Sequence, residues 1–258
     1  MTTSLSRRRL LAACTLAAAA AAMSAPPAFA FEWSFGRGEQ VKGNGNIKRE
    51  ARQVANFKGV GFSLPGQLEV RTGSSEGITI ETDDNLLPLI ETVVENGTLQ
   101  IRNKKKVNIS TRNLKVVVQT RGVDRLSLGG SGNIDADRVQ GSGLQFDIGG
   151  SGGIKVGKAE GQSININLGG SGKLNVLDGA ARELNATIGG SGNIDMARVR
   201  FDTASVTIAG SGDATLWVTK SLDMTVAGSG DVNYYGDPQV NKTAVGSGNA
   251  RRLGPAPR

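Results

Sequence analysis

The tripeptide Gly-Ser-Gly recurs along the second half of this chain at nearly constant intervals, and this repeat limits the folds available to the chain. The steps between successive serines are 20, 20, 20, 20, 18 and 18 residues. A fixed period of this length indicates an architecture in which each unit stacks on its neighbour. The serines are Ser131, Ser151, Ser171, Ser191, Ser211, Ser229 and Ser247.

Alignment of the units on these serines places apolar residues in columns at every second position. One column, three residues before the serine, contains Leu128, Ile148, Leu168, Ile188, Ile208, Val226 and Ala244. The positions between the columns are polar, as in "LQFDI" and "ASVTI". An alternation of period two predicts strands with one buried face. Each unit therefore contains two short strands joined at Gly-Ser-Gly.

These features predict an all-β, single-domain β-solenoid with two short strands per coil of 18–20 residues and an N-terminal cap that carries a hairpin. One coil alone buries too few side chains to offset the entropy of ordering it, so stacking must stabilise the fold. Lys242 and Arg252 interrupt the apolar columns of the last unit. We interpret them as charges that protect the final strand edge.

The segment 54–120 lacks the repeat but is interpreted as the start of the same solenoid, which spans 54–250 with its repeats in 121–250. "ETVVENGTLQIRN" predicts a hairpin that turns at Asn96-Gly97. "DNLLPLI" resembles a short helix capped by Asp83 or Asp84 and limited by Pro88. "LKVVVQT" is expected to be a strand that leads into the first repeat coil.

The first 30 residues have the pattern of a secretory signal peptide, with cleavage expected after Ala30. "SRRRLL" resembles a twin-arginine export signal, and an ordinary Sec signal is the alternative. The apolar run that follows is too short to span a membrane, and no later segment replaces it. We therefore expect an exported protein that is periplasmic, at the cell surface or secreted.

The ends of the mature chain are less regular. Residues 31–53 are expected to be a linker or a first coil, because "GNGNI" at 43–47 resembles the later Gly-Ser-Gly-Asn-Ile corners. Residues 251–258 form a basic tail. The only cysteine, Cys14, lies in the signal segment, so the fold must be stable without disulfides.

The motif around Ser151 matches the G-x-S-x-G turn of hydrolases, but a serine nucleophile needs a base. The chain contains no histidine, and the motif lies between two strands at a regular period. We therefore predict no catalytic residues and interpret the repeated serines as structural corners. The basic residues are too scattered for a nucleic-acid partner.

No cofactor is predicted, and metal binding has only two weak candidates. Asp213 and Asp231 occupy the same column in adjacent units, where they could form one weak calcium site. Lys173 in that column argues against a regular ion ladder.

A polar column four residues before each serine is expected to face outward and becomes threonine-rich towards the C-terminus. Such a row could bind ice or a regular glycan surface, although threonine also stacks well on exposed strands for purely structural reasons. Its members are Ser127, Asp147, Asn167, Thr187, Thr207, Thr225 and Thr243.

"VANFKGVGFSLPGQLEVRTG", "DNLLPLIETVVENGTLQIR", the run of Gly-Ser-Gly corners and "GSGDVNYYGDP" resemble the bacterial family named putative auto-transporter adhesin, head GIN domain. The resemblance covers about Val54 to Pro238 and implies an exported β-solenoid, without a mechanism or site residues. We expect a non-enzymatic protein that binds a cell-surface polymer, a glycan or an envelope protein. The alternatives are a structural or stress-related envelope component and a polysaccharide-active enzyme that uses paired carboxylates.

Overall fold

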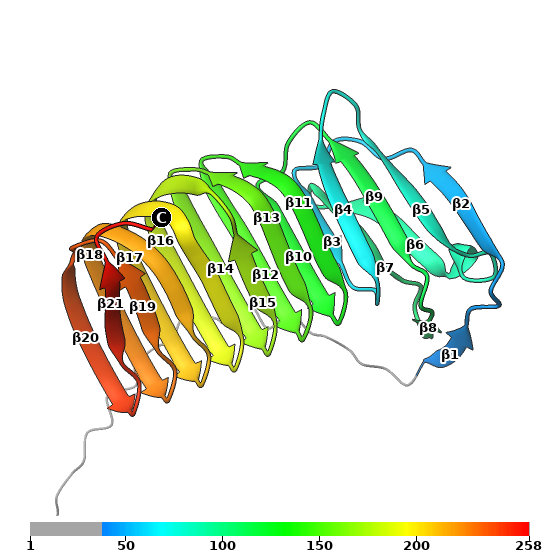
Figure 1. The fold of residues 1–258 in the computed structure, drawn as a ribbon. Helices are drawn as coiled ribbons and strands as arrows, with labels where there is room; N and C mark the ends of the chain where they lie inside the picture. The colour runs from blue at the N-terminus through cyan, green and yellow to red at the C-terminus, as the bar shows by residue number, and fades with distance from the viewer. Residues whose placement is uncertain (1–37, 258) are drawn as a thin grey trace, which may run out of the picture. The chain divides into compact units, whose positions relative to one another are not determined.

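The structure is a computed structural model, and it describes residues 38–257. These residues form a β-solenoid in which parallel strands stack coil upon coil, as Figure 1 shows. This confirms the fold predicted from the repeat. The signal segment 1–30, the cleavage position after Ala30 and residues 31–37 lie outside the described part of the chain.

The regular coils run from β10 to β21. Their strands are β10 (Arg125–Gly130), β11 (Asn133–Gln140), β12 (Gly143–Gly150), β13 (Gly153–Glu160), β14 (Ser163–Gly170), β15 (Lys173–Val176), β16 (Gly179–Gly190), β17 (Asn193–Gly210), β18 (Ala214–Gly228), β19 (Val232–Tyr235), β20 (Gln239–Gly246) and β21 (Ala250–Gly254). Strands that precede a Gly-Ser-Gly corner pair with one another and form wall A, namely β10, β12, β14, the second halves of β16 to β18, and β20. Strands that follow a corner form wall B, namely β11, β13, β15, the first halves of β17 and β18, β19 and β21.

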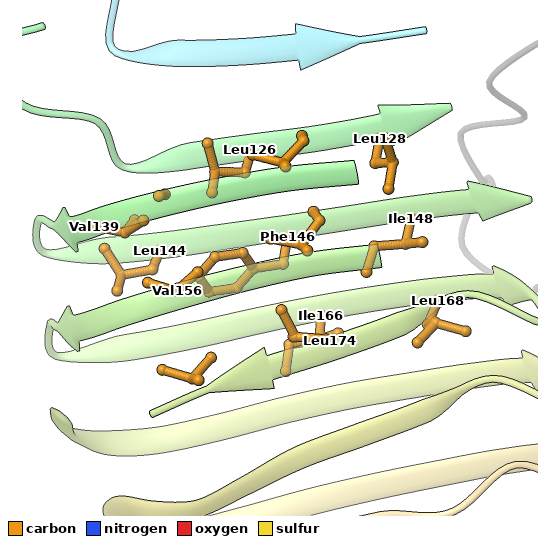
Figure 2. Close-up of a cluster of buried hydrophobic side chains, with 14 of the residues drawn as sticks. Leu126, Leu128, Val139, Leu144, Phe146, Ile148, Val156, Ile166, Leu168 and Leu174 are labelled. Carbon is orange, nitrogen blue, oxygen red and sulfur yellow. The ribbon is translucent and has the colours of Figure 1, made fainter. Parts of the chain in front are cut away.

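The apolar columns form one continuous core between the walls. Leu126 pairs in parallel with Phe146, and Phe146 pairs with Ile166, so equivalent residues of successive units lie side by side. Figure 2 shows these side chains in the interior, where Phe146 is completely buried. Burial on one face of each strand is the consequence of the period-two pattern.

The N-terminal strands extend the same stack, but not in chain order. They are β1 (Glu39–Lys42), β2 (Ile47–Arg52), β3 (Gly59–Phe62), β4 (Gln67–Thr72), β5 (Gly77–Asp83), β6 (Ile90–Glu95), β7 (Thr98–Asn103), β8 (Val107–Ser110) and β9 (Lys115–Thr120). The coil β3–β4 pairs in parallel with β10–β11 on one side and with β7 and β9 on the other. Strand β9, the predicted "LKVVVQT" strand, therefore does not stack on the first repeat coil, because β4 lies between β9 and β11.

Antiparallel strands cover the N-terminal end of the stack. Strand β5 pairs with β9, β2 pairs with β5, and β6 pairs with β7. The β6–β7 hairpin is confirmed, and Asn96 and Gly97 both have positive φ at its turn. The parallel stack thus ends in strands of opposite direction, which do not present a further coil edge.

Two N-terminal expectations differ from the structure. Residues 43–46 connect β1 to β2, and because β2 is antiparallel to β5, "GNGNI" is not a corner of the parallel stack. The short helix is a 3₁₀ turn, η1 (Leu87–Leu89), whose N-cap is Leu86 without a side-chain cap. Asp83 instead ends β5, because its carboxylate accepts hydrogen bonds from other segments.

At the C-terminal end, the two basic residues of the last coil reach neighbouring polar groups. The Lys242 ammonium donates to Asn249 Oδ1 at 3.4 Å. The Arg252 guanidinium donates to the carbonyl of Gly236 at 2.6 Å and lies 3.6 Å from a carboxylate oxygen of Asp237. Charge at this open edge opposes the addition of a further coil.

Candidate functional site

The repeated serines lie at the bends between wall A and wall B, and all seven are exposed. The backbone N–H of Ser151 donates to the carbonyl of Gly130 in the preceding coil at 3.0 Å. The same bond recurs at every later corner, from Ser171 to Ser247, at 2.9 to 3.0 Å. The backbone N–H of each serine from Ser151 onward therefore joins one corner to the previous one.

Asp213 and Asp231 belong to a second ladder at the same corners. Asp213 Oδ1 accepts the backbone N–H of Asp231 at 2.9 Å, and Asp231 Oδ1 accepts the backbone N–H of Asn249 at 2.8 Å. Asn193 does the same for Asp213 through its amide oxygen, at 3.2 Å. One oxygen of each carboxylate thus accepts a backbone hydrogen bond from the next coil, as the amide oxygen of an asparagine also does. In residues 38–257, no three Asp, Glu, His or Cys side chains gather closely enough to hold a metal ion.

The predicted polar column lies on the outer face of wall A. Thr187, Thr207, Thr225 and Thr243 pair in register on β16, β17, β18 and β20, and all four are exposed. The neighbouring column adds amide and carboxylate contacts between coils, such as Asn241 Nδ2 to Asp223 Oδ1 at 2.8 Å. Within the Ser127 to Thr243 column itself, Asn167 donates to Asp147 at 2.9 Å. We call this surface the polar ladder: the Ser127 to Thr243 column and the Arg125 to Asn241 column beside it.

The polar ladder is flat because the third outward column holds only small residues over most of its length. That column contains Gly129, Gly149, Gly169, Gly189, Ala209, Ala227 and Val245. From Asn165 onward, the wall therefore presents repeated short hydroxyl, amide and carboxylate groups at the coil spacing of about 4.8 Å. The longer side chains of Arg125 and Gln145 stand at its N-terminal end.

In residues 38–257, every carboxyl group whose pKa is clearly shifted has a lowered pKa, so the charged form is favoured. Hydrogen bonds lower the pKa of Glu69 (chiefly from Lys115), of Asp83 (chiefly from Thr111) and of Asp202 (chiefly from Lys220). The general acid of a glycosidase needs the opposite shift, a raised pKa that keeps the proton at neutral pH. These carboxylates thus lack the electrostatic environment of such an acid.

Two aromatic residues on the outer side of wall B were not predicted from the sequence. Trp217 on β18 and Tyr235 on β19 are half-buried and pair in register on neighbouring coils. Their outward position was readable from the repeat, because each follows its corner serine by the same interval, Ser211 for Trp217 and Ser229 for Tyr235. The scarcity of aromatic residues, 4% of the chain, was the second signal.

Two shallow hollows lie on the surface of the coils. One, of about 230 Å³, is lined by Gly161, Ala180, Ala181, Arg182, Arg200 and Asp202. A second, of about 420 Å³, is lined by Ser142, Gly143, Gln162, Ser163, Arg182 and Glu183. Both lie where the chain bends from wall B back to wall A, and they share Arg182.

Solved structures of bacterial proteins share this fold. A putative adhesin from Bacteroides fragilis superposes with a TM-score of 0.77 at 21% identity, covering 83% of this chain and 100% of the other. A putative lipid binding protein from Parabacteroides distasonis gives 0.69 at 23% identity, with the same coverage. A putative adhesin from Parabacteroides merdae gives 0.64 at 21% identity, covering 83% of this chain and 99% of the other.

A search of curated proteins finds no significant match. Within residues 38–257, no helix has the length and apolar character required to cross a bilayer. The family model of the putative auto-transporter adhesins matches residues 56–238, which is more than half of the sequence. This chain therefore belongs to the family described as putative auto-transporter adhesin, head GIN domain.

Proposed function

We propose that this protein is a non-enzymatic, exported adhesin-like component of the cell envelope that binds a repetitive surface polymer. The observation that carries the proposal is the polar ladder, in which Thr187, Thr207, Thr225 and Thr243 repeat in register on a flat wall. Hydroxyl groups at a constant spacing match a ligand that also repeats, such as a surface glycan. Each hydrogen bond contributes little in water, but a row of such bonds to one polymer raises the overall affinity.

Export is a part of this proposal that rests on the sequence. The signal-like segment 1–30, with cleavage after Ala30, would deliver the chain to the periplasm, the surface or the medium. Membership of a putative adhesin family and a fold shared with solved putative adhesins support this destination.

A non-catalytic role agrees with the chemistry of the corners. We infer that the seven corner serines are architectural, because the backbone of each from Ser151 onward bonds to the preceding coil and the chain has no histidine to activate a hydroxyl. Incubation with polysaccharides that the protein retains should release no new reducing ends.

The test of the polar ladder compares one substitution on each wall. Thr207→Arg places a long cation in the centre of the ladder, and Thr215→Arg places the same side chain on the outer face of wall B. On an array of bacterial surface polysaccharides, we expect the wild type and Thr215→Arg to be retained equally. Thr207→Arg should lose most of its retention, because its side chain stands above the flat surface. Equal retention of both variants, or no retention of the wild type, would remove the polar ladder as the binding surface.

A further inference from the structure

Trp217 and Tyr235 form an aromatic pair on the outer surface, away from the polar ladder. Trp217 is the only tryptophan in the described part of the chain, and the two tyrosines of the sequence follow one coil later. Tyr234 points towards the core, whereas Tyr235 points outward beside Trp217. Burying an aromatic side chain in the core stabilises a fold more than leaving it on the surface. Two neighbouring aromatic residues that face outward therefore suggest a role in binding.

The shortening of the repeat from 20 to 18 residues places this pair beside an arginine. On β17, residues 197–199 have no partner on β18, so Arg200 pairs with Trp217. The next residues, Phe201 and Val218, are both buried, which directs Arg200 and Trp217 outward. Trp217 in turn pairs with Tyr235, giving a row of one cation and two aromatic rings across three coils.

Arg200 also lines the hollow of about 230 Å³, together with Arg182. No carboxylate in residues 38–257 lies within salt-bridge distance of Arg182. Arg200 lies 4.0 Å from Asp202 and its side chain remains 59% exposed, while Asp202 is bound more closely by Lys220, at 2.9 Å. Lys220 is thus the closer partner of Asp202, and the exposed guanidinium groups of Arg182 and Arg200 can both reach an anion.

Small residues keep both parts of this surface open. Gly161, Ala180 and Ala181 line the hollow with little or no side chain, and longer side chains there would narrow it. At the other end, Gly254 pairs with Tyr235, and a Cβ at Gly254 would contact the tyrosine ring at 3.8 Å. Glycine at this position therefore leaves part of the ring uncovered.

We propose that Trp217, Tyr235, Arg200 and Arg182 form a binding site for an acidic oligosaccharide built of uronic acids. The C–H face of a sugar ring is apolar and stacks on an aromatic face, while its hydroxyl edge stays in water. The carboxylate of a uronic acid matches the planar fork of a guanidinium, which forms paired charge-assisted hydrogen bonds. The rings of Trp217 and Tyr235 would stack on the sugar faces, and the guanidinium groups of Arg200 and Arg182 would bind the carboxylates of the same ligand. The site lies apart from the polar ladder and does not depend on it.

The test is calorimetric titration of the purified protein with a galacturonate hexasaccharide and with its methyl-esterified form, in buffer without calcium. We expect the acidic form to bind and the ester to bind at least about tenfold more weakly, because the ester loses the charge-assisted hydrogen bonds to the guanidinium groups. Binding of the acidic form should weaken as salt is added.

Five variants locate the site. Trp217→Ala and Arg182→Gln should each weaken binding of the acidic hexasaccharide by about tenfold or more, and Trp217→Phe should recover part of the affinity. Val245→Ala removes an apolar side chain that is 76% exposed on β20, away from the site, and should bind as the wild type does. Arg49→Gln removes an exposed cation from β2 at the other end of the stack and serves as the charge control.

The proposal is overturned if the wild type does not bind the acidic hexasaccharide at millimolar concentration, or if Trp217→Ala binds it unchanged. It is also overturned if Arg49→Gln weakens binding as much as Arg182→Gln, since binding would then follow net charge alone. Thr207→Arg should leave this titration unchanged, which separates the site from the polar ladder.

Discussion

The carboxylate of Asp83 accepts a hydrogen bond from the hydroxyl of Thr111 at 2.6 Å, which joins the end of β5 to the segment after β8. Its other oxygen accepts the backbone N–H of Gly45, also at 2.6 Å, from the connection between β1 and β2. Asp83 is only 3% exposed, and Gly43 packs so closely against it that a Cβ there would clash with the carboxylate. One acid therefore holds together three segments of the N-terminal cap.

Asp83→Asn should lower the midpoint of thermal unfolding, because an amide has one acceptor oxygen where the carboxylate uses two. Asp135→Asn makes the same change at an exposed site on β11 and should leave the midpoint within error. Thermal scans by circular dichroism would compare the two. Equal midpoints for the two variants would show that Asp83 does not stabilise the cap.

The contribution of Asp83 should disappear in acid. The hydrogen bonds from Thr111 and Gly45 lower its pKa below the ordinary value of 3.8, so the folded state favours the charged form. The resulting stability is complete above pH 3.8 and is lost as the pH falls through the lowered pKa. Urea unfolding from neutral pH downward should therefore show the difference between wild type and Asp83→Asn shrinking below pH 3.8. A difference that persists unchanged in strong acid would contradict this.

Gly150→Ala should destabilise the protein more than Gly130→Ala. Both glycines have positive φ, so each substitution carries a backbone strain of about 1 kcal/mol. A Cβ at Gly150 would also lie 2.4 Å from the carbonyl oxygen of Gly130, whereas a Cβ at Gly130 meets nothing within 4 Å. We expect a further loss of roughly 1–3 kcal/mol at Gly150, measured by urea unfolding. Equal losses would mean that the corners are not in tight contact.

Phe146→Ala should cost about 3–5 kcal/mol of unfolding free energy, because the ring is completely buried between Leu126 and Ile166 and would leave a cavity. Val245→Ala on the exposed face of β20 should change the free energy by less than about 0.5 kcal/mol. Chemical unfolding of both variants measures this contrast. A small loss at Phe146 would indicate that the core collapses around the site.

Asp231→Asn should preserve stability, whereas Asp231→Ala should reduce it. The backbone N–H of Asn249 needs the side-chain oxygen of residue 231, and an amide oxygen provides it as Asn193 does for Asp213. Asparagine also removes the repulsion between stacked carboxylates. Adding calcium and then a chelator should leave the thermal midpoint unchanged. A midpoint that rises with calcium, and does so only when Asp231 is present, would instead establish a metal site.

The coils of the solenoid could be predicted from the repeat. The spacing of Ser131, Ser151 and the later serines predicts which residues stack, because a parallel register repeats the same side chain at every coil. Alternation identified the buried face of each strand, and Asn96-Gly97 identified the hairpin. These signals are local or periodic, so they can be read without knowing what lies next to each segment.

The order of the N-terminal strands and the surface around Trp217 could not be predicted from the sequence, because both depend on contacts between distant segments. Strand β4 lies between β9 and β11. Residues 54–120 contain no repeat, so the sequence does not indicate which of these strands pair with one another. Arg200 meets Trp217 because residues 197–199 of β17 have no partner on β18, and a second irregularity between Phe201 and Thr203 then restores the 18-residue offset of the shorter coil. The sequence shows that the coil is shortened by two residues, but the position of the irregularity depends on packing across the coil.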